Sequence, residues 1–333
     1  MTSKQIPSRP LFDALPLDKS GPPGNAWGLY GADDQLGALN LLTPETVVAA
    51  AQEIKTGERI SLDWHLNKPS RPSFDRPPFE VKLRNSHGRT INDDELHFNT
   101  QCSTQWDGFR HFGYQGAKRF YGNRTQDDVE KTGVLGIDVW AENGGIVGRG
   151  VLLDYVSFCH RHSITFEPMT STSIPLEHIE QMVREQNVSF QSGDILVLRV
   201  GFTAVYNTLD AAGQVALAQR PTPDFLGVEP TAAMLRWLWE SGFAAVVSDS
   251  PSFEQAPVEG LWTSKELEDR VKDGGLLHQV LIGGWGMPIG EMFDLENLAE
   301  TCQRLGRWTF FISSVPLKVP GGVASPPNAV AIF

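Results

Sequence analysis

The sequence has few cysteines, no long apolar run and a deficit of positive charge. It contains 3 cysteines in 333 residues, and 28 lysines and arginines against 40 aspartates and glutamates, which gives a net charge of −12. No apolar run is long enough to span a bilayer, and the segment 1–17 lacks the apolar core of a secretory signal. The acidity disfavours nucleic acid and anionic membrane surfaces as partners. Cys102, Cys159 and Cys302 are odd in number and widely spaced, which suits reduced thiols, so we expect a cytoplasmic protein.

Motifs of several common protein classes are also missing. The chain has no Gly-x-Ser-x-Gly, no Gly-Lys-Ser/Thr and no Cys-x-x-Cys. The glycine-rich run 144–150 precedes a predicted strand instead of opening a helix, so it lacks the helix N-terminus that binds phosphate. These absences argue against serine-hydrolase, P-loop and zinc-ribbon functions.

Helical and apolar-strand segments alternate along most of the chain, which indicates an α/β fold around a central mixed sheet. The first helix is the clearest, because Thr43 suits its N-cap, Pro44 suits its first turn and Gly57 follows its end. Residues 1–40 are rich in proline and glycine and are predicted as an extended N-terminal arm, with a single catalytic domain at 41–333. The expected helices are 44–55, 175–186, 231–240 and 295–305, and the expected strands are 60–64, 151–155, 195–200, 243–248, 308–312 and 329–333.

The segment 101–111 contains four residues that bind metals or move protons: Gln101, Gln105, Asp107 and His111. A strand over 100–107 would place Gln101, Ser103, Gln105 and Asp107 on one face. His111 would then reach the same place if the chain turns after Asp107. Such a cluster can hold a hard metal ion, activate water or polarise a carbonyl, whereas a polar edge strand is the alternative interpretation. The sequence therefore predicts an enzyme.

Other histidines are less informative by themselves. His278 is flanked by apolar residues, as a buried core histidine would be, and Glu291 follows a glycine-rich bend. His160 and His162 have no carboxylate near them in the sequence, which favours a solvated strand end over a metal site. His97 is expected to be a strand residue next to the site.

The segment 101–111 aligns without a gap with His-x-Gly-Thr-His-x-Asp-x-x-x-His, the motif of the cyclase-like superfamily of kynurenine formamidases and isatin hydrolases. The resemblance continues through DDQLGALNLLTPETV at 33–47, GVLLDY at 150–155, SGDILVLRVG at 192–201, VVSDSPSFE at 246–254, LLHQVLIGGWGMPIGE at 276–291 and GGVASPPNAVAIF at 321–333. It implies a swivelling β/β/α fold and a homo-oligomer, either dimer or tetramer. It also implies hydrolysis of small cyclic or aryl amides with a divalent metal.

The resemblance also assigns roles to single residues. Asp107, His278 and Glu291 match metal-ligand positions, and His111 matches the catalytic base. The first two histidines of the motif are Gln101 and Gln105 in this chain, and the motif glycine is Ser103. Because a neutral amide oxygen is a weak, hard ligand, we expect manganese or magnesium rather than zinc, held weakly, or no metal.

Three functions follow from these residues. The first is a hydrolase of a small cyclic or aryl amide or lactone, with His111 as base and Asp107 and Glu291 as further catalytic groups. The second is a metal-independent cyclase, dehydratase or isomerase, in which Gln101 and Gln105 donate hydrogen bonds to a substrate carbonyl while His111 and Asp107 move protons. The third is a non-catalytic binder of a small ligand. We expect hydrolysis of a small molecule, with a flat substrate walled in by Trp106, Phe109 and Trp285, aided by Phe112 and Tyr114.

Overall fold

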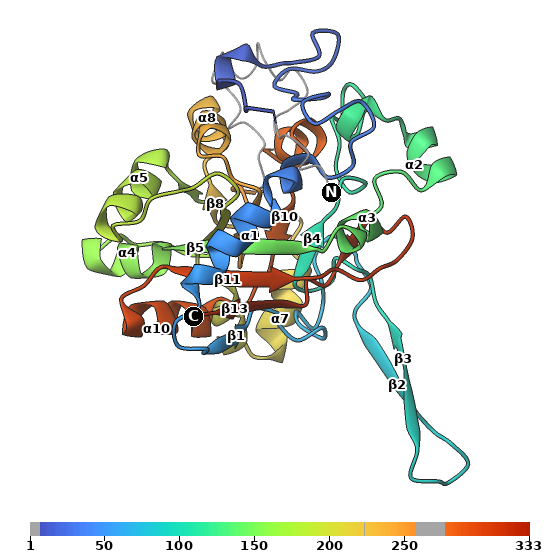
Figure 1. The fold of residues 1–333 in the computed structure, drawn as a ribbon. Coiled ribbons are helices and arrows are strands. Elements are labelled where there is room, and N and C mark those ends of the chain that lie inside the picture. Colours follow the sequence, from blue (N-terminus) through green and yellow to red (C-terminus); the bar gives the residue numbers. More distant parts are fainter. Residues whose placement is uncertain (1–6, 223, 257–276) are drawn as a thin grey trace.

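A mixed β-sheet runs through the centre of the molecule (Figure 1). The computed structural model describes residues 7–222, 224–256 and 277–333. Within these residues, nine strands form one sheet in the order β1-β13-β11-β5-β7-β9-β10-β4-β12. The sheet and its surrounding helices confirm the α/β class. The strands are β1 (Arg59–Ser61), β4 (Gln105–Asp107), β5 (Ile146–Asp154), β7 (Ile195–Arg199), β9 (Ala245–Ser248), β10 (Ile289–Glu291), β11 (Thr309–Ser314), β12 (Ala324–Ser325) and β13 (Ala329–Ile332).

The central strands of this sheet are parallel, and both flanks are antiparallel. β5, β7, β9 and β10 pair in parallel in that order. β11, β13 and β1 continue the sheet antiparallel on one side, and β4 and β12 do so on the other. β5, β7 and β9 consist largely of buried apolar residues, as parallel strands do when both faces are covered. The glycine-rich run at 144–150 enters β5 itself rather than only preceding it.

Helices cover the sheet, and their starts follow the expected capping chemistry. The Thr43 side chain accepts the backbone N–H of Thr46, and Pro44 occupies the first turn of α1. α1 ends at Ala50 and continues as a 3₁₀ turn to Glu53, two residues short of the predicted end.

Among the described residues, no helix is long and apolar enough to cross a membrane. The helices are α1 (Pro44–Ala50), α2 (Gln126–Thr132), α3 (Asp138–Glu142), α4 (Tyr155–His162), α5 (Leu176–Glu185), α6 (Phe202–Thr208), α7 (Ala211–Ala218), α8 (Ala232–Glu240) and α10 (Glu296–Leu305).

In the described part of the chain, two smaller strand pairs lie outside the central sheet. β6 (Ser173–Ile174) and β8 (Gly227–Val228) form a short parallel pair. β2 (Glu80–Asn85) and β3 (Asn92–His97) form an antiparallel hairpin that projects from the body (Figure 1). His97 is a strand residue as predicted, but it lies on this exposed hairpin.

The N-terminal arm is joined to the body by hydrogen bonds from two tryptophans. The Trp27 indole N–H donates to the Gly283 carbonyl over 2.8 Å, and the Trp285 indole N–H donates to the Gly24 carbonyl over 2.9 Å. From residue 7 on, where the structure describes it, the arm has only short 3₁₀ turns, η1 (Phe12–Ala14) and η2 (Gly37–Leu41). Its course over the upper body is visible in blue in Figure 1. The extended arm is therefore confirmed, while a domain boundary at residue 40 stays a prediction.

The end of this arm depends on close backbone packing at Gly37. Gly37 has φ +52°, and an added Cβ would lie 2.1 Å from the Gly286 carbonyl oxygen. We expect Gly37→Ala to lower the free energy of unfolding much more than Gly57→Ala. Gly57 also has positive φ, at +75°, but its Cβ would meet nothing within 4 Å. The Gly57→Ala control should lose about 1–2 kcal/mol of unfolding free energy from backbone strain alone. Denaturant unfolding of both variants measures the two losses. Equal losses would contradict the packing argument.

Candidate active site

Two neighbouring strands bring an amide and two carboxylates to one place in the protein interior. Gln105 and Asp107 lie on β4, and Glu291 lies on β10, where it pairs directly with Gln105. Directly paired residues of an antiparallel ladder share a face of the sheet, and so do residues two apart on one strand. The three side chains therefore converge, and their exposed fractions are only 0%, 0% and 3%. Such burial of carboxylates requires compensating partners.

The glutamines supply part of that compensation. The Gln101 side-chain amide donates to Asp107 Oδ1 over 2.8 Å. The Gln105 amide donates to Asp107 Oδ1 over 3.2 Å and to Glu291 Oε2 over 2.9 Å. Both hydrogens of the Gln105 amide are thus directed at carboxylates, whereas the Gln101 amide has one acceptor, Asp107, among the described residues. This corrects the expectation that Gln105 donates to a substrate carbonyl.

The predicted strand is also shorter than expected. Only Gln105–Asp107 form a strand, and Gln101 approaches Asp107 from a turn. Ser103 does not join the cluster, because its hydroxyl donates to the His65 carbonyl over 3.0 Å. The predicted convergence of Gln101, Gln105 and Asp107 is nevertheless what the structure shows.

His278 enters the cluster from the other side of Glu291. It immediately precedes the π-helical segment η5 (Gln279–Gly284), and its Nε2 lies 3.1 Å from Glu291 Oε1 and 3.7 Å from Asp107 Oδ2. Its Nδ1 lies 2.8 Å from each carboxylate oxygen of Glu254. Burial lowers the pKa of His278, but the charge of Glu254 and hydrogen bonds to the surrounding carboxylates outweigh it and raise the pKa well above its ordinary value. A protonated His278 therefore places a positive charge among these carboxylates.

His111 lies at the more open edge of the cluster. Its Nε2 is 3.8 Å from Asp107 Oδ2, and 19% of its side chain is exposed, against 9% for His278. The Phe112 ring packs between the two histidines, with centroid distances of 5.8 Å to His111 and 5.6 Å to His278. Burial lowers the pKa of His111, and the nearby Asp107 only partly opposes this. A neutral imidazole with some access to solvent is a suitable proton acceptor.

The two carboxylates differ in their affinity for protons. Burial, together with the negative charge of Asp107, raises the pKa of Glu291 to about 7. Burial also acts to raise the pKa of Asp107, but the neighbouring imidazoles of His111 and His278, the latter through a hydrogen bond as well, outweigh it and lower the pKa. Asp107 is therefore the more strongly ionised of the pair, as is usual for two neighbouring carboxylates.

Asp107, His278 and Glu291 form a buried group that could hold a metal ion. One ligand atom from each lies within 4.8 Å of the others. Asp107 Oδ2 and Gln105 Oε1 are buried without a hydrogen-bond partner among the described residues, and unpaired buried acceptors suit a cation. Glu254 holds the ring of His278 through Nδ1, as outer carboxylates commonly do for metal-binding histidines. These residues fit a divalent ion.

Three aromatic residues predicted to wall in a substrate lie in the core instead. Trp106 is fully buried and donates to the Ser314 hydroxyl over 2.8 Å. Phe109 packs against Tyr121 and Trp140, and Trp285 packs against Trp239. Their exposed fractions of 0%, 0% and 1% leave no surface for a ligand. The expectation that these three residues contact a substrate is therefore corrected. Tyr114 is equally buried. Phe112 is the aromatic side chain that contacts the histidines.

Two residues near the cluster were missed by sequence reasoning. Glu254 is fully buried and contacts His278, yet a single glutamate six residues beyond β9 gives no pattern to recognise. Arg76 donates to the Gln101 carbonyl over 2.9 Å, and its charge acts on the pKa values of Asp107, His111 and Glu291. It lies in a proline-rich loop with no regular spacing, so only the folded chain reveals its position.

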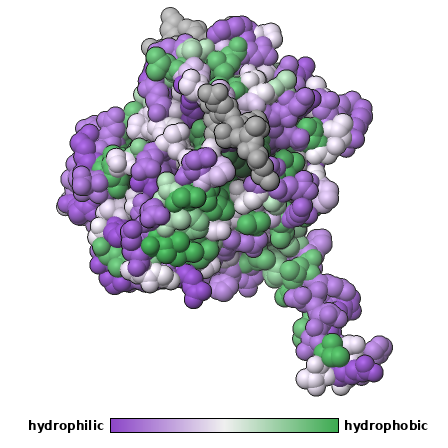
Figure 2. Space-filling model, in the orientation of Figure 1, coloured by the Kyte–Doolittle hydropathy of each residue, from purple (hydrophilic) through white to green (hydrophobic). Residues whose placement is uncertain are grey.

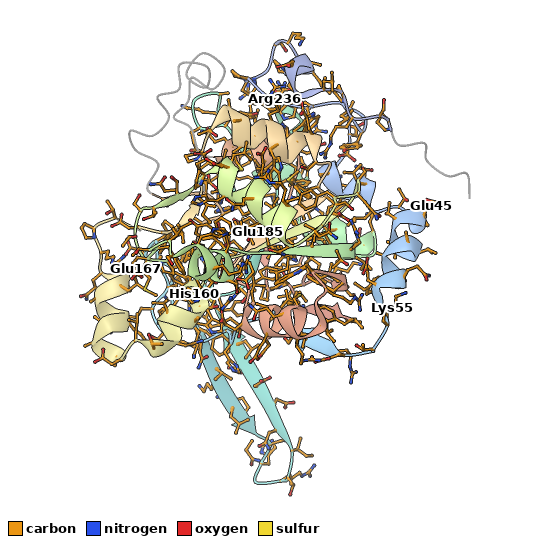
Figure 3. The ribbon with its side chains drawn as sticks, turned by 90° about the vertical axis from the view of Figure 1, so that its left-hand side faces the viewer. Glu45, Lys55, His160, Glu167, Glu185 and Arg236 are labelled. Carbon is orange, nitrogen blue, oxygen red and sulfur yellow. The ribbon has the colours of Figure 1, made fainter. Side chains whose placement is uncertain are left out.

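The other histidine pair lies at the surface, away from this cluster. His160 and His162 end α4, so the expected strand end is in fact a helix end. His162 Nε2 lies 2.6 Å from Glu185 Oε1 of α5, a carboxylate that the sequence order did not place nearby. Figure 3 shows His160 and Glu185 on these two adjacent helices.

Comparisons with known proteins agree with this architecture. The chain is 28% identical to a crystal structure described as a novel cyclase, with a TM-score of 0.78 over 93% of this chain and 99% of that one. Isatin hydrolase A from Ralstonia solanacearum is 15% identical, with a TM-score of 0.59 over 87% of this chain and 98% of that one. An isatin hydrolase bound to the product analogue thioisatinate is 14% identical, with a TM-score of 0.56 over 87% and 99%.

A comparison with curated proteins gave no match. The model of the Cyclase family matches residues 35–255, which is most of the chain and includes the segment from Gln101 to His111. The family and its structural neighbours include enzymes, and the resemblance expected from the sequence is confirmed. The chain therefore belongs to the Cyclase family.

Proposed function

We propose that the protein is a hydrolase of a small cyclic or aryl amide or lactone, with His111 as its general base. The observation that carries this proposal is the position of His111. Its Nε2 lies beside the unpaired Asp107 Oδ2, at the more exposed edge of an otherwise buried Asp-His-Glu group. Structural similarity to isatin hydrolases supports hydrolysis of a small ring as the reaction class.

The same group would hold the divalent ion that such a hydrolase uses. Asp107 Oδ1 and Glu291 Oε2 already accept amide hydrogens. Asp107 Oδ2, Glu291 Oε1 and His278 Nε2 would bind the ion, which would take the place of the proton between the last two atoms. When bound, it would supply Lewis-acid activation of water and of a substrate carbonyl. Two carboxylate oxygens and one imidazole form a mainly hard ligand set, which favours manganese or magnesium over zinc.

The protein side chains would move the proton and hold the site in position. His111 would accept a proton from the attacking water and return it to the leaving nitrogen or oxygen. Asp107 would stabilise the imidazolium that forms, since its Oδ2 lies 3.8 Å from His111 Nε2. Glu254 would hold His278 through two contacts of 2.8 Å.

Replacing the base tests this role directly. We expect His111→Ala to lower kcat/KM about 10²–10⁴-fold, because general-base catalysis contributes about that factor. The measurement is turnover of a panel of aryl lactams, formyl-anilides and lactones, assayed with added manganese. His162→Ala is the matched control, since that histidine pairs with Glu185 at the surface, and it should retain full activity. Absence of wild-type turnover on every member, with and without manganese, would overturn the hydrolase proposal.

A metal-independent cyclase, dehydratase or isomerase is the second candidate. It is favoured by the hydrogen bonds of Gln105 to both carboxylates and by the contact of His278 with Glu291, which compensate the buried charge without an ion. In this mechanism the remaining amide hydrogen of Gln101 would bind a carbonyl, and His111 and Asp107 would move protons. Activity that survives strong chelator but is lost in His111→Ala would favour this candidate over the hydrolase.

The glutamines also give a prediction about metal selectivity. We expect Gln105→His to increase zinc affinity at least about tenfold, because imidazole is a better zinc ligand than a neutral amide. Zinc affinity is measured by competition with a chromophoric chelator. Gln219→His, at the exposed end of α7, is the control and should leave the affinity unchanged. An unchanged zinc affinity in Gln105→His would contradict the assignment of Asp107, His278 and Glu291 as the ligands.

A further inference from the structure

Arg76 places a positive charge beside the candidate active site. It lies in the loop that leads into β2. Among the residues that the structure describes, its guanidinium has one hydrogen-bond acceptor, the Gln101 carbonyl at 2.9 Å, and no carboxylate as an ion-pair partner. A guanidinium has five N–H donors in a planar fork, so most of the donors of Arg76 are not used by these residues.

Two contacts hold the guanidinium in place. Its Nη1 donates to the Gln101 carbonyl, and its central carbon lies 4.9 Å from the centre of the Phe74 ring, in a cation–π contact. The Phe74 ring packs in turn against the buried Phe225, with centroids 6.4 Å apart. Phe74 and Asp75 have positive φ, at +61° and +54°, a conformation that is costly for residues other than glycine. The loop thus accepts backbone strain, as ligand sites often do, and presents Arg76 in a defined position.

Gln101 connects Arg76 to the candidate active site. Its carbonyl accepts from Arg76, while its side-chain amide donates to Asp107 Oδ1 over 2.8 Å. After burial and nearer groups, the charge of Arg76 also acts to lower the pKa values of Asp107, His111 and Glu291. The guanidinium is therefore close enough to act on the site, yet it makes no ion pair with Asp107 or Glu291. It lies beside the place of a reacting carbonyl rather than on it.

The surroundings of this loop are partly apolar. Phe74 is 52% exposed, and Figure 2 shows apolar surface at the root of the β2–β3 hairpin. An ion pair formed beside apolar surface is screened less than one in open water. An anion with a flat aromatic body suits this combination, because the body can pack on apolar surface while its charge meets the guanidinium fork.

We propose that Arg76 binds a carboxylate of the substrate, which is then an aryl amide or lactone with an acid group on its aromatic ring. This inference rests on the proposed hydrolase function and deepens it, because it names a charged substrate class. Two parallel N–H···O bonds from a guanidinium fit a carboxylate. The acid group would fix the orientation of the ring while His111 acts at the carbonyl. Arg76 is thus a specificity-determining residue and takes no part in proton transfer.

Binding of unreactive ligands tests this site without any turnover. The probes are meta-acetylbenzoate and meta-acetylbenzamide, which share a ring and a ketone and differ by one negative charge. We expect the wild-type protein to bind the acid at least about tenfold more tightly than the amide, since a hydrogen bond to a charged group contributes about that factor or more. Isothermal titration calorimetry should show this preference lost in Arg76→Gln and partly kept in Arg76→Lys.

Arg71→Gln is the matched control, because Arg71 is exposed on the same loop, and it should keep the full preference for the acid. Partial rescue by Arg76→Lys shows that the glutamine variant fails for lack of charge and not for lack of folding. A wild-type protein without the preference, or an Arg76→Gln variant that keeps it, would overturn the proposal.

Turnover separates a failure of this inference from a failure of the hydrolase function. The measurement is kcat/KM for meta-formamidobenzoate and for formanilide, with added manganese. We expect Arg76→Gln to lower the value for the acid at least about tenfold more than the value for formanilide, mainly through KM, because the lost contact binds substrate and transition state alike. Equal losses on both substrates would overturn the proposal and leave the hydrolase in place. Charge-selective binding that depends on Arg76, without turnover of either substrate, would support the anion site and count against hydrolysis.

Discussion

Much of this structure depends on the compensation of negative charge buried between β4 and β10. Asp107, Glu291 and Glu254 are 0–3% exposed, and uncompensated carboxylates at such depth would be strongly destabilising. His278 lies within 3.1 Å of Glu291 and 2.8 Å of Glu254, and the Gln105 amide donates to both Asp107 and Glu291. Burial and the negative charge of Asp107 still raise the pKa of Glu291 to about 7, although His278 acts to lower it. Charge compensation and the proposed chemistry therefore depend on the same side chains.

The N-terminal arm holds the segment that follows His278 in this network. Trp27 and the backbone of Ala26 donate to the carbonyls of Gly283 and Gly284, at the end of the π-helical segment that follows His278. Trp285 returns a hydrogen bond to Gly24. π-Helical segments are less regular than α-helices and are often found at functional sites. Since the arm covers this one, the position of His278 relative to Glu291 depends on residues more than 250 positions earlier in the chain.

The glutamines distinguish this site from one with histidines at the same positions. An amide provides both hydrogen-bond donors and an acceptor, whereas a neutral imidazole provides one of each. Gln105 uses its donors on Asp107 and Glu291, and its Oε1 has no partner among the described residues. This arrangement weakens the case for zinc while keeping a hard cation compatible with the remaining oxygens.

The sequence by itself determined the fold class, most helices and strands, and the convergence of Gln101, Gln105 and Asp107. These follow from local signals: buried apolar runs for β5, β7 and β9, the Thr43 cap of α1, and residues that lie within eleven positions of each other. The contacts of His278, Glu254 and Arg76 were decided by tertiary structure, because each reaches the cluster across a large sequence separation. Tertiary structure also decided that Trp106 lies in the core, because the face of β4 opposite Gln105 and Asp107 is covered by distant residues such as Phe293. Local preferences are encoded residue by residue, whereas the environment of a buried charge exists only after distant strands have paired.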